Sequence, residues 1–179
     1  MGKVMLELEA STYNELLSHL LPTGADFERA AFVFASASAT GDDVLFREVE
    51  WLLVNQDGLS ASSDVYLELS DETRAFIIKR AHDLGASLVE FHSHLGAWPA
   101  AFSSSDRMGF QEFVPHVWWR LKGKPYLAIV VAASGFDGLA WITNPNTPAA
   151  LDGLVIGKRC LRPTGLSFKN WDKHERKPI

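Results

Sequence analysis

The stretch Ser87-Leu-Val-Glu-Phe-His-Ser-His94 combines an apolar strand with two histidines at its carboxyl end. A loop over 96–102 follows it and separates it from the next predicted helix. Side chains alternate between the two faces of a strand, so histidines two positions apart point to the same face. We therefore expect a central strand over 87–92 that presents His92 and His94 together at its end.

Further strands and helices are expected on both sides of this segment. Apolar runs predict strands over 4–8, 29–36, 43–54, 65–69, 126–133, 139–143 and 154–156, with a turn over 134–138. Helical spacing of apolar residues predicts helices over 11–21, 71–84 and 104–114. Ser11 and Ser70 are the expected N-caps, Gly85 fits a helix C-terminus, and Pro115 is expected to end the third helix. The pattern predicts an α/β or mixed α+β fold, with a mixed sheet flanked by about three helices.

The composition is typical of a globular protein with a substantial core. The chain has 179 residues, 47% of them hydrophobic, and a formal net charge of −5. This length predicts one domain, and the negative charge argues against a nucleic-acid surface, which needs a basic face. The single cysteine, Cys160, excludes an internal disulfide and a CxxC zinc site. Because no signal-peptide pattern or membrane-length apolar run is visible, we expect a cytoplasmic protein that binds no membrane.

Asp106 completes a set of three metal ligands with the two histidines. Two neutral imidazoles and one carboxylate are a usual ligand set of a catalytic zinc ion, with the fourth position left to water. Ser103-Ser-Ser-Asp106 also has the pattern of a helix N-terminus, in which the serine caps the helix and the acid satisfies a free amide. The two roles are compatible because a helix start holds an aspartate rigidly. We predict one Zn²⁺ ion bound by His92, His94 and Asp106.

The arrangement resembles the signature of the JAMM metalloproteases, also called the MPN-plus or JAB family. That signature has an upstream glutamate, then His-Ser/Thr-His, seven residues, Ser, two residues and Asp. His92-Ser93-His94 and Ser103-Ser-Ser-Asp106 match it. Eight residues separate His94 from Ser103, one more than usual, and Leu95 stands where proline is common. We interpret the additional residue as a loop insertion that leaves the helix in place.

The resemblance implies a fold and roles for two further residues. It implies a single MPN/JAB domain with cytidine-deaminase-like layering over residues 1–157, and it leaves 158–179 as a C-terminal extension with a polar tail from Lys169. Glu28, after a helix and before a buried strand, would be the general base that takes a proton from water and later gives it to the leaving amine. Ser103 would donate a hydrogen bond to the developing oxyanion.

Glu90 is a second acid on the face of the two histidines, and two interpretations of it stay open. It could orient an imidazole through a hydrogen bond, or it could replace Glu28 as the base. We favour Glu28 as the base, because a residue two positions before a ligand is poorly placed to reach past the metal to a substrate.

The expected activity is that of a zinc-dependent isopeptidase or peptidase. Proteins of the JAMM family cleave next to the C-terminal glycine of ubiquitin or ubiquitin-like proteins, and compact prokaryotic members are associated with activating-enzyme-like and conjugating-enzyme-like partners. The resemblance thus implies deconjugation or maturation of a ubiquitin-like modifier by a metal-activated water. The alternative is a non-catalytic MPN-type interaction module, a class that typically lacks such ligands. A zinc deaminase is excluded because it needs Pro-Cys-x-x-Cys.

Overall fold

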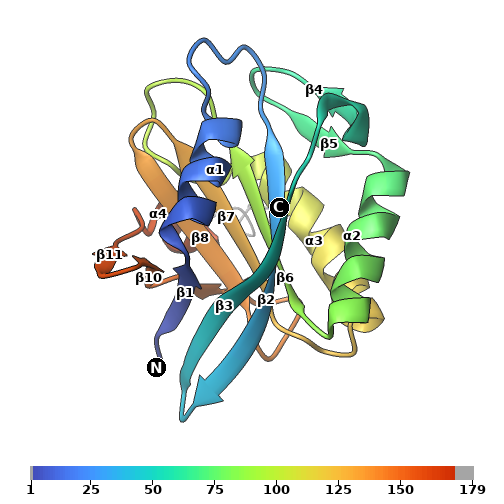
Figure 1. The fold of residues 1–179 in the computed structure, drawn as a ribbon, viewed down its shortest axis with the longest axis vertical. Coiled ribbons are helices and arrows are strands. Elements are labelled where there is room, and N and C mark those ends of the chain that lie inside the picture. Colours follow the sequence, from blue (N-terminus) through green and yellow to red (C-terminus); the bar gives the residue numbers. More distant parts are fainter. Residues whose placement is uncertain (1, 172–179) are drawn as a thin grey trace, which may run out of the picture.

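The computed structural model describes residues 2–171, which fold into a mixed α+β structure around a large twisted sheet (Figure 1). The expected fold class is therefore confirmed. The helices of this part of the chain are α1 (Ala10–Leu20), α2 (Asp71–Leu84), α3 (Ser104–Arg120) and the short α4 (Leu166–Asn170), with a 3₁₀ turn over Gln56–Gly58. Its strands are β1 (Val4–Leu8), β2 (Ala30–Thr40), β3 (Asp43–Leu53), β4 (Leu59–Ser62), β5 (Leu67–Leu69), β6 (Ser87–Ser93), β7 (Tyr126–Ala132), β8 (Gly135–Trp141), β9 (Ala149–Ala150), β10 (Gly153–Ile156) and β11 (Arg159–Leu161).

The main sheet places the histidine-bearing strand at its centre. Within residues 2–171 its strands follow the order β11-β10-β1-β3-β2-β6-β7-β8-β9, and β4 pairs separately with β5. β6 runs antiparallel to β2 and parallel to β7. β6 has a strand on each side and helices over both faces of the sheet, which explains why it is buried almost throughout.

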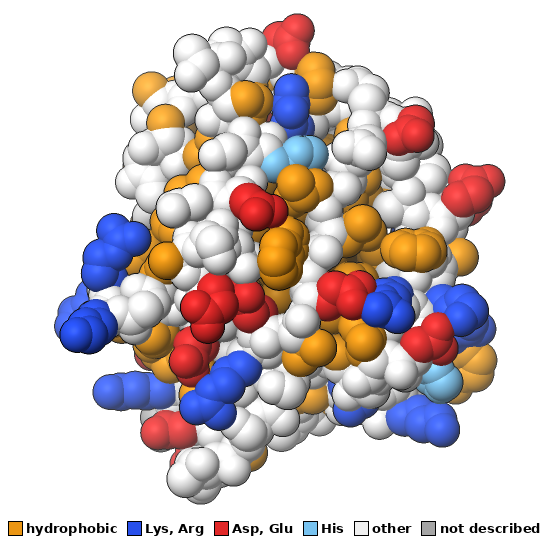
Figure 2. Space-filling model, in the orientation of Figure 1, with side chains coloured by type: hydrophobic (Ala, Val, Ile, Leu, Met, Phe, Trp, Pro, Cys, Tyr) orange, Lys and Arg blue, Asp and Glu red, His pale blue; other side chains and the backbone are white. Residues whose placement is uncertain are grey.

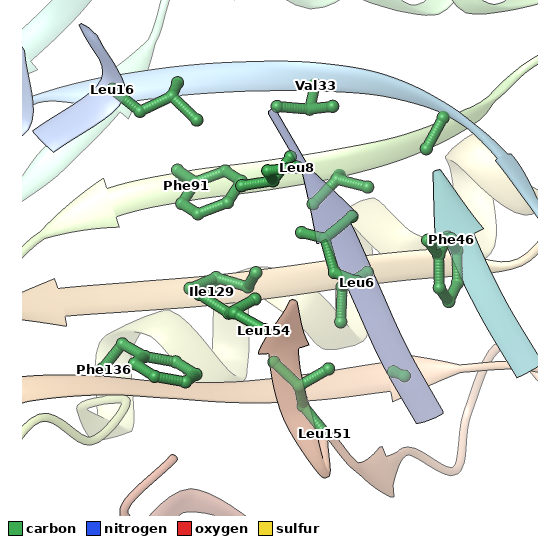
Figure 3. Packing of buried hydrophobic residues seen from close by; sticks show 14 of the residues in the cluster. Leu6, Leu8, Leu16, Val33, Phe46, Phe91, Ile129, Phe136, Leu151 and Leu154 are labelled. Atoms are coloured by element: carbon green, nitrogen blue, oxygen red, sulfur yellow. The ribbon is translucent and has the colours of Figure 1, made fainter. Parts of the chain in front are cut away.

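Helices cover both faces of the sheet and create two hydrophobic cores. On one face α1 packs through Leu16 and Leu20 against a cluster that includes Phe91 and Ile129. Figure 3 shows part of this core, with Leu16 of α1 and Phe91 of β6 among the labelled side chains. On the other face α2 and α3 bury a second cluster, which includes Phe110.

Side chains along β6 alternate between the two faces of the sheet, and this determines which of the two cores each residue packs against. Val89 and Phe91 belong to the α1 side, whereas Leu88 belongs to the α2–α3 side. Glu90 and His92 therefore face α3, because side chains two positions apart share a face.

Most predicted elements are confirmed. β1 and β3 occupy the expected ranges to within one residue, and α2 spans Asp71–Leu84 as predicted. The Ser70 side chain accepts a hydrogen bond from the Thr73 N–H, and Gly85 ends the helix in the left-handed conformation. α1 begins two residues earlier than expected, with Glu9 rather than Ser11 as its N-cap.

The prediction that Pro115 ends the third helix was wrong, because α3 continues to Arg120. A proline inside a helix lacks the N–H that would bond the carbonyl four residues earlier. Val114 and Val117, on either side of this proline, are buried in the core. We attribute the continuation of the helix to this packing, which outweighs one lost hydrogen bond.

The turn predicted over 134–138 is shorter in the structure, and Asp137 lies inside β8. Its side chain is 1% exposed. The carboxylate accepts hydrogen bonds from the backbone N–H groups of Gly165 and Ser167, at 2.9 and 2.7 Å. A polar residue thus occupies a buried strand position because a distant segment satisfies it, which local turn statistics do not detect.

Residues 158–171 stay attached to the sheet. β11 pairs antiparallel with β10, and α4 lies against β8 and β9. The polar tail predicted from Lys169 lies outside the described residues from position 172 onward. On the face shown in Figure 2, acidic and basic side chains are interspersed around hydrophobic patches. None of the helices within residues 2–171 has the length and apolar character needed to cross a membrane.

Candidate metal centre

β6 brings the two predicted histidine ligands to one point. The Nε2 atoms of His92 and His94 lie 3.2 Å apart. Ser93 between them points to the opposite side, where its Oγ accepts a hydrogen bond from the Arg29 N–H at 2.9 Å. The side chain of His92 is 6% exposed and that of His94 is 21% exposed, so the pair has one side open to solvent.

The first turn of α3 holds Asp106 against the histidines. Ser103 caps the helix by accepting a hydrogen bond from the Asp106 N–H at 3.2 Å. In return, the N–H and the hydroxyl of Ser103 each donate to Asp106 Oδ2 at 2.7 Å, which completes a capping box. The same carboxylate lies 3.1 Å from His94 Nε2 and 3.6 Å from His92 Nε2. Asp106 thus caps α3 and also lies next to both imidazoles, so the capping role is confirmed and the ligand role stays a prediction.

The geometry of these three side chains fits a small tetrahedral metal ion. One ligand atom from each residue lies within 4.8 Å of the others. The two Nε2 atoms lie 3.2 Å apart, Asp106 Oδ2 lies 3.1 Å from His94 Nε2, and Asp106 Oδ1 lies 3.6 Å from His92 Nε2. Zinc bonds of about 2.0–2.1 Å in tetrahedral geometry place ligand atoms about 3.3 Å apart. The site therefore has the size of a metal site, and the identity of the ion as zinc stays a prediction.

In the absence of an ion, the same groups form a charged cluster. Burial alone would lower the pKa of His92, but Asp106 and Glu90 outweigh it and raise the pKa to about 10. Burial alone would raise the pKa of Asp106, but the two histidines and Ser103 hold it well below its usual range. Negative charge therefore predominates around the imidazoles, which is the environment that a divalent cation requires.

The register of the sheet places Glu28 beside the ligand set. Ala30 of β2 pairs with His92 of β6 in antiparallel register, so Glu28 stands opposite His94. Its Oε1 lies 3.9 Å from His94 Nε2, and its side chain is 6% exposed. Burial raises the pKa of Glu28, although the histidines partly offset the effect. The carbonyl of Glu28 accepts a hydrogen bond from the Ser62 hydroxyl at 2.8 Å, which fixes the backbone at this position.

A hydrogen-bonded chain supports His92 from the side away from the other ligands. Glu90 Oε1 lies 3.4 Å from His92 Nδ1, and the Tyr126 hydroxyl donates a hydrogen bond to Glu90 Oε2. Burial, reinforced by Glu90, raises the pKa of Tyr126. A carboxylate at Nδ1 keeps the proton there and leaves Nε2 free for a metal. The geometry thus favours the orienting interpretation of Glu90, and Tyr126 is a residue that the sequence did not single out.

Glu90→Gln is expected to weaken zinc binding without removing a ligand. The amide keeps the size of the side chain but loses the charge that favours the required tautomer of His92, and such supporting carboxylates are worth about 10–100-fold in metal affinity. Competition with a chromogenic chelator measures this effect. Glu50→Gln is the matched control. Glu50 lies on β3 and accepts a hydrogen bond from Arg80 of α2 at 2.8 Å. Equal zinc affinity of the two variants would contradict the orienting role.

A cleft of about 470 Å³ opens at the ligand set and extends between β5 and α3. Its lining includes Glu90, His92 and Asp106, together with Ser105. The Oγ atoms of Ser105 and Ser103 lie 2.9 Å apart. The Ser103 hydroxyl donates to Asp106, whereas Ser105 lines the cleft. The oxyanion role of Ser103 stays a prediction.

Comparisons with known proteins leave the family of the chain open. Neither a family model nor a curated protein matches it. Among solved structures, the Trichoplax adhaerens STIL N-terminal domain is similar with a TM-score of 0.34 and 9% sequence identity. The match covers 73% of this chain and 37% of that chain, so this chain spans little more than a third of the length of that structure. The JAMM resemblance is therefore carried by the residues of the site alone.

Proposed function

We propose that this chain is a zinc-dependent peptidase or isopeptidase of the JAMM type, which cleaves next to the C-terminal glycine of a ubiquitin-like modifier. The observation that carries the proposal is the convergence of two imidazoles, one carboxylate and one further buried acid, with one of the imidazoles and the carboxylate lining a cleft. These are His92, His94, Asp106 and Glu28, and their types and order match the JAMM signature. Such a combination has the parts that metal-assisted hydrolysis requires.

The chemistry follows from the roles that these side chains can take. A metal ion held by His92, His94 and Asp106 would lower the pKa of a water molecule and polarise the carbonyl of the scissile bond. Glu28 takes the proton of the attacking water and transfers it to the leaving amine. Burial raises the pKa of Glu28, and a base with a raised pKa is better matched to neutral pH. Glu90 contacts Nδ1 of His92 and keeps the imidazole oriented.

The cleft provides the surface along which a peptide segment can approach the site. Leu67 and Leu69 of β5 line one side, and Met108 and Phe113 of α3 line the other. Charged side chains, among them Glu68, Arg74 and Glu112, line the cleft as well, so it offers both apolar and polar contacts to a peptide. We propose that a C-terminal segment of the modifier lies here, that activating-enzyme-like and conjugating-enzyme-like proteins act with this protein, and that it works in the cytoplasm.

Cleavage of modifier fusions tests the proposal directly. The purified, zinc-loaded protein is incubated with C-terminal fusions of ubiquitin-like proteins, and the products are identified by mass spectrometry. We expect cleavage after the terminal glycine that stops with a chelator and returns with added Zn²⁺. Fusions with the terminal glycine replaced by valine serve as the control. A protein that binds one zinc ion but leaves every fusion intact would refute the substrate class, and one that binds no zinc would favour the non-catalytic interaction module.

A further inference from the structure

The loop between His94 and α3 is held from outside the ligand set. It covers residues 96–102, the part of the chain with the additional residue. The Thr164 hydroxyl donates to the Ala100 carbonyl at 2.6 Å, and the Phe102 N–H donates to Ser167 Oγ at 2.9 Å. Ala100 and Phe102 are buried, so these bonds satisfy backbone groups that would otherwise lie unpaired away from water.

The segment that holds the loop is itself anchored by one buried carboxylate. Asp137 of β8 accepts the N–H groups of Gly165 and Ser167 at the start of α4. Hydrogen bonds to a carboxylate are stronger than those between neutral groups. A second connection joins α4 to α3, because the Arg107 guanidinium donates to the Asn170 carbonyl at 2.7 Å. The C-terminal segment therefore contacts the loop at one end and the helix that carries Asp106 at the other.

Phe102 connects this support to the ligands. Its ring lies 5.4 Å from the imidazole of His92 and 4.9 Å from the ring of Phe110, measured between centroids. Ser103, whose cap holds Asp106, follows Phe102 directly. A displacement of Phe102 would therefore disturb one ligand ring and the helix start that carries another ligand.

We infer that the segment Thr164–Trp171 positions the metal centre, with Asp137 as its buried anchor and Ser167 as its contact with the loop. The inference rests on the proposed metal site and extends it to residues that bind no metal themselves. Each residue added to a loop increases the conformational freedom that must be lost when its ends are fixed. The hydrogen bond that Thr164 donates to the loop and the one that Ser167 accepts from it reduce this freedom in a spacer that is longer than in the JAMM signature.

Ser167→Ala tests the inference with little change of volume. We expect two effects: about tenfold weaker Zn²⁺ binding, at the lower end of what supporting residues contribute, and faster hydrogen exchange of the peptide over 96–106 in the metal-free protein. Asp137→Asn should act in the same direction. The two carboxylate oxygens accept from two N–H groups, and the amide has only one oxygen that can accept. Ser70→Ala is the matched control, since it also removes a serine that accepts a backbone N–H, at the start of α2.

The two readouts separate this inference from the proposed function. If the wild-type protein binds no Zn²⁺, the proposed metal site is wrong. The rate of hydrogen exchange in the loop over 96–102 then decides by itself whether the segment over 164–171 holds this loop in place. Unchanged loop exchange in both Ser167→Ala and Asp137→Asn, or changes no larger than in Ser70→Ala, would overturn the positioning role. Faster loop exchange with unchanged zinc affinity would also overturn it, because the segment would then order the loop without supporting the ligands.

Discussion

Glu28→Gln is expected to reduce the rate of cleavage by about 10²–10⁴-fold while the protein keeps one zinc ion. The amide has the size of the carboxylate but cannot accept a proton from the attacking water. Glu28 lies 3.9 Å from His94 Nε2, close enough to serve the same substrate atoms and outside the three-ligand set. The loss should therefore appear in kcat, measured under saturating fusion substrate, with zinc content determined by mass spectrometry of the native protein.

Glu50→Gln again provides the control, since it removes a hydrogen-bonded carboxylate that lies on β3 and faces Arg80. Comparison with Glu90→Gln distinguishes the roles of Glu28 and Glu90, the two acids near the histidines. Glu90 contacts Nδ1 of His92, so its loss should act first on metal affinity, and saturation with Zn²⁺ should restore much of the rate. Normal turnover by Glu28→Gln, together with an inactive Glu90→Gln that stays zinc-loaded, would reverse our assignment of the base.

The convergence of the three proposed ligands could be predicted because each of these residues follows a local rule. Alternation along a strand brings His92 and His94 to one side, and the capping pattern places Asp106 at the first turn of α3. Glu28 is different, since only the pairing of β2 with β6 brings it opposite His94. No local pattern predicts this register, and the resemblance to the JAMM signature supplied what periodicity could not.

Tyr126 shows what local patterns do not reveal. Tyr126 lies on β7 and pairs with Leu88 of the parallel strand β6, which puts it diagonally next to Glu90 of β6. A tyrosine at the start of an apolar strand gives no sign of this from its own neighbours. The same reasoning applies to Asp137, whose partners at Gly165 and Ser167 lie in a distant segment. Long-range polar contacts of this kind depend on tertiary packing, which sequence periodicity does not encode.

Asp106→Asn and His92→Ala are both expected to abolish stoichiometric zinc binding and, with it, cleavage. Each substitution removes one of three protein ligands. Zinc affinity should therefore fall by more than the about 10–100-fold expected when a residue that only supports a ligand is replaced. Asp106→Asn is the more informative variant, because asparagine can still accept the hydrogen bonds that Ser103 donates in the capping box. The helix start should then stay in place while the charge beside the imidazoles is lost.

A separate measurement distinguishes this ligand role from a purely structural one. Asp71→Asn removes an exposed acid from the first turn of α2 and should cost about 0.3–1 kcal/mol of helix stabilisation without altering zinc binding. Ser103→Ala removes the cap itself and should cost about 1 kcal/mol of stability, with the zinc ion retained at saturating concentration. If Asp106→Asn binds zinc as tightly as Asp71→Asn does, the aspartate only caps α3. The two histidines would then need a third ligand from elsewhere, and Glu28, whose Oε1 lies 3.9 Å from His94 Nε2, would be the candidate on the Nε2 side of the imidazoles.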